Sequence, residues 1–432
     1  MTLDDIRQCG IIGAGGAGFP THIKLQSKPD TVIMNAAECE PLLHKDMQIL
    51  LHHADTVLEG MRMVMEMTGA PRGIIGIKEK HDHEIELLRR MLPKGIELMP
   101  LEDVYPAGDE VTLIYMTTRR IVQPGALPIS VGCVVQNVET LYNIGAGVPV
   151  TEKFISVAGA VTEPATLRVP IGTTYADVLS HFTVTASNYA VRSGGLMMGR
   201  LEADLSVPVS KRTGALIVLP DDHHCVTMYR RFATDHDTVR IAKASCDQCS
   251  FCTELCPRYL LGQPVRPEIA MRNRMFSREE EPMLFAGNFS CCECNLCTMY
   301  SCPEGLDPRG ATVIEKRLAR EQKLQWSGLP QPDHPMYEYR KTPTQKLMQR
   351  LDVVRYEAEG ALKDVVFSGS EVRIPLDQHT GAPALPVVAE GMTVSRGDVI
   401  AQPGAAVSAF VHASVAGRVR SVDARHIIIQ RM

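Results

Sequence analysis

The sequence lacks any stretch suited to a membrane. No uninterrupted apolar run approaches the ~18 residues that a membrane-spanning helix needs, so no membrane span is expected. The opening residues, Met1-Thr2-Leu3-Asp4-Asp5, are acidic and lack the apolar core of a secretory signal. We therefore expect no signal peptide.

Basic clusters are lacking as well. The formal net charge is −5 at pH 7, and no block of Lys and Arg is interleaved with aromatic residues. Proteins that bind nucleic acids usually carry such a block, so no nucleic-acid partner is expected. With 45% apolar and 22% charged residues, the composition is that of a soluble globular protein. A chain of 432 residues is too long for one ordinary core and predicts two to four domains.

Cysteine, in contrast, is abundant, and eight of the 13 cysteines fall into two runs. The runs read Cys246-x-x-Cys249-x-x-Cys252-x-x-x-Cys256-Pro257 and Cys291-x-x-Cys294-x-x-Cys297-x-x-x-x-Cys302-Pro303. Three thiolates at two-residue intervals can wrap one face of a cuboidal iron–sulfur cluster, and the fourth lies where the chain has turned toward a second cluster. The runs therefore predict two [4Fe-4S] clusters in a ferredoxin-like module.

In such modules the fourth Cys of each run usually serves the other cluster. We expect one cluster on Cys246, Cys249, Cys252 and Cys302, and the other on Cys291, Cys294, Cys297 and Cys256. Cys292 is a spare thiol, and spacing favours Cys291 because it alone keeps the two-residue interval to Cys294. Zinc sites usually present Cys in pairs, and disulfides need an oxidising compartment, so both alternatives fit less well. Thiolate ligands need a reducing environment, which places the protein inside the cell.

The N-terminal third alternates between strand-like and helix-like segments. Apolar, β-branched runs at 31–35, 73–78 and 96–99 predict buried strands, and helical spacing of apolar residues predicts helices over 44–67 and 82–91. This alternation predicts an α/β domain with a largely parallel sheet.

Four polar or glycine-rich segments interrupt this domain. Gly13-Ala14-Gly15-Gly16-Ala17-Gly18 can converge backbone N–H groups on an anion, although taken alone such a loop is often only a turn. Polar residues 35–40 follow the first strand, where α/β sheets bind ligands. The segment 105–110 precedes a predicted helix over 110–119, and 136–140 contains Asn and Thr that can hydrogen-bond a ring or a phosphate. In isolation each would be a helix cap or turn.

The order of these segments resembles the FMN-binding subunit of respiratory complex I and the C subunits of Rnf electron-transport complexes. The resemblance implies that the Gly-rich loop and a Lys hold the FMN phosphate, that residues after the strand contact the ribityl chain and ring, and that a last Asn and Thr complete the phosphate site. When these roles are transferred to the matching positions of this sequence, the implied FMN contacts are Gly13, Gly15, Gly16, Gly18, Lys24, Asn35, Glu38, Gly108, Asp109, Glu110, Asn137 and Thr140. The chain departs from the complex I pattern at Ala14 and Ala37, which makes the phosphate site the firmer part of the assignment.

The remaining chain predicts three further domains and a linker. Residues 1–150 form the FMN- and NADH-binding Rossmann-like domain, and 151–235 resemble a β-grasp (SLBB) domain, either ligand-binding or a spacer. Residues 236–320 hold the two [4Fe-4S] clusters, 321–363 read as a linker, and 364–432 resemble a barrel-sandwich hybrid domain. That last domain lacks the modifiable Lys of biotinyl and lipoyl carriers, so no covalent cofactor is expected there.

With the barrel-sandwich segment at its C-terminal end, the chain resembles the cobalamin reductases of propanediol-utilisation bacterial microcompartments. The resemblance implies NADH as co-substrate, FMN and two [4Fe-4S] clusters as cofactors, and reduction of cob(III)alamin to cob(II)alamin and cob(I)alamin for coenzyme B12 recycling. It also implies a cytoplasmic microcompartment location, with an adenosyltransferase and a shell protein as partners, and leaves a homo-oligomer open. No Asp-x-His-x-x-Gly corrinoid loop occurs, so cobalamin is expected to bind only transiently, and no side chain stands out as an acid or base. The alternative is an electron-transfer subunit or adaptor with another acceptor.

Overall fold

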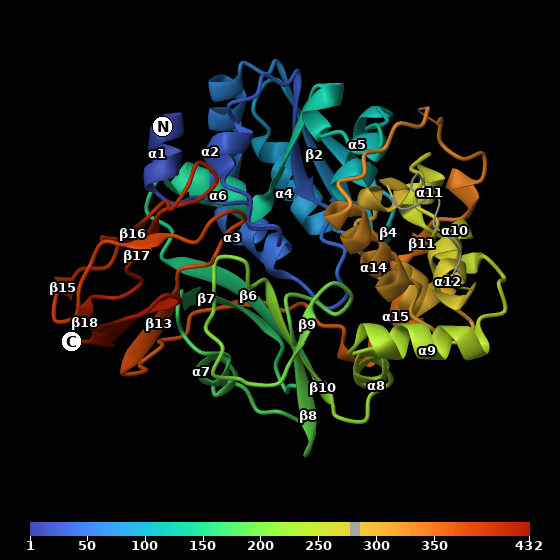
Figure 1. Ribbon diagram of the computed structural model, residues 1–432. Coiled ribbons are helices and arrows are strands. Elements are labelled where there is room, and N and C mark those ends of the chain that lie inside the picture. The colour runs from blue at the N-terminus through green and yellow to red at the C-terminus, as the bar shows by residue number, and fades with distance from the viewer. Residues whose placement is uncertain (277–285, 330) are drawn as a thin grey trace.

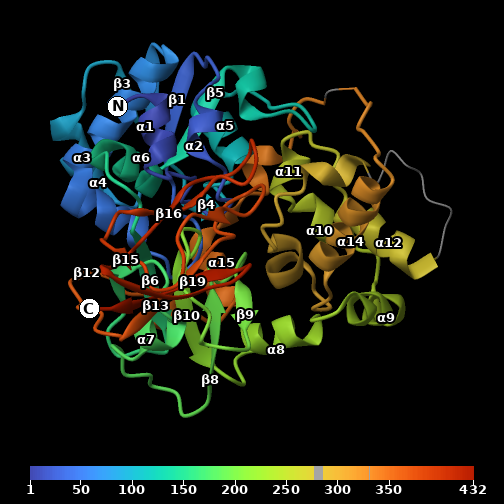
Figure 2. The same cartoon turned by 60° about the vertical axis from the view of Figure 1, so that its left-hand side comes forward.

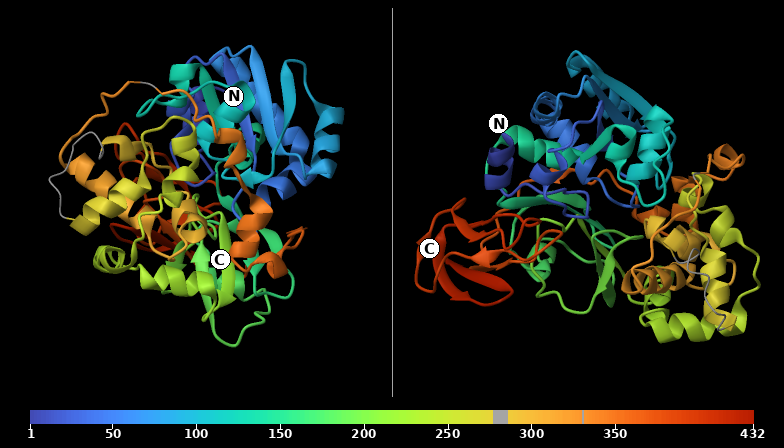
Figure 3. Two further views of the ribbon diagram at one scale, coloured as in Figure 1. Left: turned by 90° about the vertical axis from the view of Figure 1, so that its right-hand side faces the viewer. Right: turned by 45° about the horizontal axis from the view of Figure 1, so that its top comes forward.

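The computed structural model describes residues 1–276, 286–329 and 331–432. Four regions can be distinguished in Figure 1, with the first domain at the top and the second sheet below it. Figure 3 shows the helical region that carries the cysteine runs and the C-terminal strands at opposite sides of the molecule, with the first two sheets between them. This multidomain α/β organisation confirms the predicted fold class.

The first domain is built on a four-stranded, fully parallel sheet. Its strand order is β3 (Ile96–Leu101), β2 (Arg72–Lys78), β1 (Thr31–Ala36) and β5 (Cys133–Asn137). Strands β1 and β2 are buried along nearly their whole length because helices cover the sheet, which explains their continuous apolar runs. The helices are α3 (Lys45–Thr68), α4 (Asp82–Met91), α5 (Glu110–Thr118) and α6 (Val138–Ala146). The predicted parallel sheet and helices are thus confirmed.

Glycines let α3 and α6 pack closely together. A Cβ at Gly60 of α3 would lie 1.9 Å from the carbonyl oxygen of Leu141, and one at Gly145 of α6 would lie 1.9 Å from that of Thr56. Neither position can accept a side chain while the helices keep this separation. The contact fixes the start of α6, which lies in the candidate site.

The second domain contains a six-stranded mixed sheet and the short helix α7 (Tyr175–Leu179). Its order is β12 (Leu362–Lys363), β7 (Ala165–Pro170), β6 (Glu152–Gly159), β10 (Ala215–Pro220), β8 (Tyr189–Ser193) and β9 (Arg200–Glu202). The central strands β6 and β10 are parallel, while β7 and β8 flank them in the antiparallel direction. This mixed sheet occupies the segment in which the resemblance predicts a β-grasp domain.

Helices dominate the region of the cysteine runs, and no strand occurs in its described residues between 236 and 320. Before the first gap lie α8 (His224–Arg231), α9 (Asp235–Ser245), α10 (Phe251–Glu254), α11 (Pro257–Leu260) and α12 (Pro267–Phe276). After it come η2 (Asn288–Ser290), η3 (Cys297–Ser301) and α14 (Pro308–Glu321). Helix α14 packs on α9 and α12, and buried Met271, Leu306 and Ala311 form part of a small core there.

The segment 321–363 is more than the linker expected from its composition. After η4 (Tyr337–Tyr339), strand β11 (Thr342–Pro343) pairs with β4 (Val104–Tyr105) of the first domain, and β12 extends the second sheet. Between them, α15 (Thr344–Arg350) buries Leu347 and Met348 completely or nearly so. The many Pro, Gln and charged residues around these few apolar positions hide them in the sequence.

The C-terminal region forms two small sheets that face each other. One contains β13 (Glu371–Pro375), β19 (His426–Arg431), β18 (Gly417–Val422) and β15 (Thr393–Val394). The other contains β14 (Leu385–Pro386), β16 (Val399–Gln402) and β17 (Val411–His412). Figure 2 shows these strands lying across the junction of the first two domains. The arrangement agrees with the predicted barrel-sandwich domain, and none of the described helices is long and apolar enough to cross a membrane.

Candidate functional site

The Gly-rich loop lies between α1 (Leu3–Gln8) and α2 (Thr21–Lys24). Gly13 N–H donates to the carbonyl oxygen of Phe19 at 2.9 Å, and Ala14 N–H donates to Thr140 Oγ1 at 2.9 Å. The next two amides, those of Gly15 and Gly16, form no hydrogen bond of ordinary geometry with the described residues. Gly16 has a φ of 119°, and a Cβ there would meet nothing within 4 Å. The loop therefore presents free N–H groups beside open space, as an anion-binding concavity requires.

Asn137, at the junction of β5 and α6, lies against this loop. A Cβ at Gly15 would come within 3.4 Å of the Asn137 Cβ. Asn137 caps α6 by accepting a hydrogen bond from Glu139 N–H at 3.0 Å, and its Nδ2 donates to Asp46 Oδ2 at 2.7 Å. The loop and the N-terminus of α6, both favourable to an anion, thus face the same space.

A buried network of charges supports this corner of the site. Lys45 Nζ lies 2.6 Å from Asp46 Oδ1 and 3.2 Å from Glu139 Oε2, and Glu139 also pairs with Lys153 of β6. Burial alone would raise the pKa of Glu139, but Lys153 and Lys45 outweigh it and lower the pKa below its usual value. Burial lowers the pKa of Lys153 to about 8. The cluster joins the first domain to the second beneath the loop.

Asn35 lies within β1, one residue before the strand ends, and Glu38 follows the strand. Asn35 Nδ2 donates to the carbonyl oxygen of Gly108 at 2.9 Å, and Glu38 Oε2 accepts from Asp46 N–H at 3.3 Å. The other carboxyl oxygen of Glu38, Oε1, is buried and has no hydrogen-bond partner among the described residues. Burial, followed by the negative charge of Asp46, raises the pKa of Glu38 to about 8. An unpartnered buried oxygen of this kind fits an N–H or O–H group of a ligand.

The segment 108–110 closes the other side of the site. Lys24 Nζ lies 2.6 Å from Glu110 Oε1, so this lysine reaches α5 and not open solvent. A Cβ at Gly108 would lie 2.6 Å from the carbonyl oxygen of Ala37, which explains the glycine. Asp109 caps α5 by accepting from Thr112 N–H at 3.1 Å.

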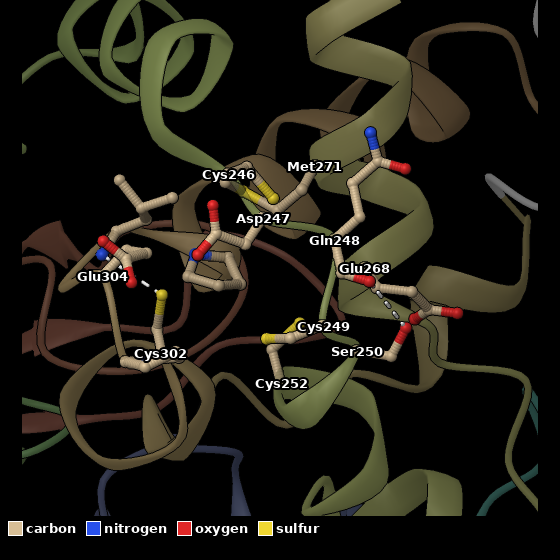
Figure 4. Close-up of a pocket in the computed structure, with 13 residues that line it drawn as sticks. Cys246, Asp247, Gln248, Cys249, Ser250, Cys252, Glu268, Met271, Cys302 and Glu304 are labelled. Atoms are coloured by element: carbon tan, nitrogen blue, oxygen red, sulfur yellow. Dashed lines mark hydrogen bonds between the residues drawn. The ribbon is translucent and has the colours of Figure 1, made fainter.

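Four cysteines of the predicted first cluster line one pocket, shown in Figure 4. They are Cys246, Cys249, Cys252 and Cys302, three from the first run and one from the end of the second. Cys249 is exposed, whereas Cys252 and Cys302 are buried, so the pocket has one side toward the solvent. Leu306 N–H donates to Cys302 Sγ at 3.3 Å, as amides do toward cluster sulfur ligands.

The other thiols gather nearer the first domain. Cys291 and Cys256 lie close enough to Cys297 to influence its pKa electrostatically. Cys291 and Cys292 influence the pKa of Cys256 in the same way. Burial, followed by the proximity of Cys291, raises the pKa of both Cys297 and Cys256. Cys292 lies among Cys294, Arg258 and Asp109. All 13 cysteines are free thiols in the structure.

Two polar contacts connect the segment 105–110 to the cysteine runs. Tyr105 donates its O–H to the carbonyl oxygen of Cys294 at 2.6 Å. Arg258, two residues after Cys256, binds Asp109 through two hydrogen bonds of 2.9 and 2.7 Å. The segment 105–110 thus contacts the second run directly and the first run through Arg258, the residue after its Pro257.

Comparison with known proteins places these features in a family. The Nuo51 FMN-binding domain matches residues 6–146, the 4Fe-4S dicluster domain matches 245–307, and the RnfC barrel sandwich hybrid domain matches 362–432. Cobalamin reductase PduS of Citrobacter freundii is 40% identical over 432 residues, covering 99% of this chain and 95% of that protein. Cobalamin reductase PduS of Salmonella typhimurium is 40% identical over 441 residues, covering 100% and 97%. The chain belongs to the PduS family.

More distant relatives cover parts of the PduS-type chain. One subunit of the proton-translocating ferredoxin:NAD(+) oxidoreductase complex of Clostridium ljungdahlii is 33% identical, over 60% of this chain and 56% of its own length. A chain in the crystal structure of an NAD+-reducing [NiFe]-hydrogenase in the H2-reduced state matches with a TM-score of 0.50 and 22% identity. That match covers 75% of this chain and 62% of the other, and it shows a shared fold.

The residues present fit the cofactors of these domains. Free loop amides and the unpartnered oxygen of Glu38 face the FMN region, and four thiols surround the pocket between the runs. This PduS-family chain is therefore an oxidoreductase that uses FMN and [4Fe-4S] clusters for electron transfer. Sequence reasoning missed Lys45, Asp46, Glu139 and Lys153, which form the buried network, and Arg258 and Tyr105, which join the domains. Tyr105 and Glu139 lie within the polar segments 105–110 and 136–140 that the sequence singles out, and Lys153 is a charged residue in a mostly apolar strand.

Proposed function

We propose that this chain is an NADH-dependent cobalamin reductase. Electrons from NADH pass through FMN and two [4Fe-4S] clusters to cob(III)alamin, giving cob(II)alamin and then cob(I)alamin for coenzyme B12 recycling in propanediol degradation. The observation that carries the proposal is 40% identity to PduS reductases along almost the whole length of both chains. The domain boundaries proposed with it are 1–150, 151–235, 236–320, 321–363 and 364–432.

In the FMN site, the amides of Gly15, Gly16 and Gly18 are assigned to the phosphate, and Gly13 shapes the loop through its bond to Phe19. Asn137 and Thr140 complete the cradle. Lys24 and Glu110 form one wall, and Asn35, Glu38, Gly108 and Asp109 lie on the side of the ribityl chain and ring. Bound FMN would supply the redox chemistry that converts the two electrons of a hydride into single electrons. The residues themselves bind and orient, since a hydride transfer requires no protein acid or base.

The two ligand sets are assigned unequal positions on the electron route. The set Cys256, Cys291, Cys294 and Cys297 lies toward the FMN domain, because Tyr105 and Asp109 contact Cys294 and Arg258 directly. The set Cys246, Cys249, Cys252 and Cys302 lines the pocket that includes the exposed Cys249. We therefore assign electron entry to the cluster on the second run and electron exit to the cluster at the exposed pocket.

The last reduction is the thermodynamically difficult step. Each ~59 mV by which an acceptor's potential lies below that of its donor costs tenfold in a one-electron equilibrium. Removal of cob(I)alamin by alkylation would pull the reaction forward, so an adenosyltransferase is the proposed partner. A microcompartment location, with a shell protein as a second partner, follows from the same family relationship.

A second candidate is an electron-transfer subunit or adaptor with another acceptor. The 33% identity to one component of a ferredoxin:NAD(+) oxidoreductase complex favours it specifically. In that case the clusters would pass electrons to a protein docked near the exposed pocket, and corrinoid would play no part.

Anaerobically purified protein, with its flavin and iron contents determined, distinguishes the two. Stopped-flow mixing with NADH should bleach the flavin, and a second mixing with cob(III)alamin should then produce the cob(II)alamin spectrum. Bleaching without corrinoid reduction would favour the second candidate. Protein that contains flavin but is not bleached by NADH would contradict the NADH-dependent reaction.

A further inference from the structure

Carbonyl oxygens of the Gly-rich loop accept hydrogen bonds from the second domain and from the C-terminal domain. Thr380, in the C-terminal domain, donates its N–H to the carbonyl oxygen of Gly18 at 2.9 Å and its Oγ1–H to that of Ala17 at 2.6 Å. Lys153, in the second domain, donates from Nζ to the carbonyl oxygen of Ala14 at 3.3 Å. Three contacts to the loop therefore come from outside the FMN domain.

Because each peptide unit is planar, these contacts also fix the direction in which the loop N–H groups point. In a planar trans peptide the C=O and the N–H point in opposite directions. A carbonyl of Ala14 directed at Lys153 aims the N–H of Gly15 away from it, and a carbonyl of Ala17 directed at Thr380 does the same for the N–H of Gly18. Holding the loop by its carbonyl side fixes the amide side, which is the side that an anion would occupy.

The donors are themselves held firmly. Gln378 is fully buried and accepts a hydrogen bond from Lys211 N–H at 3.0 Å, which ties the segment before Thr380 to the second domain. His379 Nε2 accepts from Ala409 N–H at 3.1 Å inside the C-terminal domain. Arg212 packs on the loop, since a Cβ at Gly18 would lie 2.7 Å from Arg212 Cδ.

We propose that the second and C-terminal domains act as a clamp on the carbonyl side of the Gly-rich loop, with Thr380 and Lys153 as positioning residues that pre-order its amides for the FMN phosphate. The clamp rests on the proposed placement of that phosphate at the loop. It assigns a function to the C-terminal domain, in which none of the proposed cofactor contacts lies. FMN retention thereby depends on residues more than 100 positions from the loop in the sequence.

The test compares Thr380→Val with Thr393→Val. The first variant loses the hydroxyl donor but keeps the branched side chain and the backbone N–H. The second makes the same change at an exposed position of β15 in the same domain. Full-length protein stripped of FMN is titrated with FMN and separately with riboflavin, which lacks the phosphate, and binding is followed by flavin fluorescence. Hydrogen exchange of the peptide covering 13–18 is measured before flavin is added.

Thr380→Val should weaken FMN binding about threefold, the effect of one partly exposed hydrogen bond, and should leave riboflavin binding unchanged. Exchange in the loop should rise relative to Thr393→Val. Lys153→Met, which removes a charged donor, should weaken FMN binding about tenfold, with the circular dichroism spectrum reporting whether the variant is folded.

Equal FMN affinity and equal exchange in the two threonine variants would overturn the clamp. So would an equal loss of FMN and riboflavin binding, because the effect would then not pass through the phosphate. Faster loop exchange with unchanged FMN affinity would also overturn it, since the loop would be held without serving the phosphate. The NADH and corrinoid reactions of the unaltered protein test the proposed function separately.

Discussion

The hydroxyl of Tyr105 binds the carbonyl oxygen of Cys294 at 2.6 Å across the boundary between the FMN domain and the cysteine runs. Tyr105 is only 2% exposed, so water cannot replace either partner. The tyrosine ends β4, which pairs with β11, while Cys294 lies in the second run. This bond joins the segment 105–110, part of the proposed FMN site, to Cys294, a proposed cluster ligand.

Replacing Tyr105 by Phe should lower the thermal midpoint of the anaerobic holoprotein. The change removes the donor and leaves a buried carbonyl unpaired, at a cost of about 1–3 kcal/mol. For domains of this size each kcal/mol corresponds to about 2–4 °C. Tyr339, which is 80% exposed, offers the matched control, and Tyr339→Phe should leave the midpoint unchanged. Equal midpoints for the two variants would mean that the Tyr105 bond contributes nothing.

The ion pair between Asp109 and Arg258 should behave as a unit. Their side chains are 10% and 14% exposed, and breaking such a pair leaves a nearly buried charge that costs about 3–5 kcal/mol. Asp109→Asn isolates the charge effect, because Asn still caps α5. The double variant with Arg258→Met should recover part of the loss in thermal midpoint. The control is Asp221→Asn, at the exposed pair with Arg230, which should cost less than about 1 kcal/mol. If the losses of Asp109→Asn and Arg258→Met simply add in the double variant, the two residues are not coupled.

The ligand assignment predicts opposite outcomes for two cysteine substitutions. Cys249→Ala should remove the EPR signal of one reduced cluster and lower the iron content by about half, because Cys249 lines the pocket with Cys246, Cys252 and Cys302. Cys292→Ala should keep both signals. Loss of a cluster in the second variant would show that Cys292, and not Cys291, is the ligand.

The sequence predicted the elements of the first domain well because each carries a local signal. Helix α4 follows the apolar spacing of residues 82–91, and β1 and β2 are continuous apolar runs flanked by turns. The grouping of Cys246, Cys249, Cys252 and Cys302 followed from the geometry that a cluster imposes on such runs. In each case a short stretch of chain contains the information.

The remaining features depend on residues far apart in the chain. Lys153 meets Glu139 and the carbonyl oxygen of Ala14, and Thr380 meets a loop more than 360 positions earlier, without any local pattern in the sequence. The packing of 321–363 was missed for a related reason, since β11 and β12 are two-residue strands that exist only through their partners β4 and β7. Long-range pairing of this kind leaves no periodicity to read.

Lys211 makes the stability of the three-domain junction depend on pH. Its amine is almost completely buried and donates to the carbonyl oxygens of Gly10 at 2.7 Å and Phe410 at 2.8 Å, and the thiol of Cys9 interacts with it electrostatically. Burial lowers the pKa of Lys211 from 10.5 to about 7. His412 and His379 also face it, and burial lowers the pKa of each, so neither adds a charge above pH 7.

Between pH 7 and 10.5 the unfolded chain therefore holds a proton on Lys211 that the folded chain has released. Stability rises with pH wherever the unfolded state binds more protons, here by about 1.4 kcal/mol per pH unit. The thermal midpoint of the unaltered protein should accordingly increase relative to that of Lys211→Met as the pH is raised from about 7 to about 9.5, while its difference from Thr393→Val stays constant. A difference from Lys211→Met that does not change with pH would mean that the buried amine keeps its proton throughout this range.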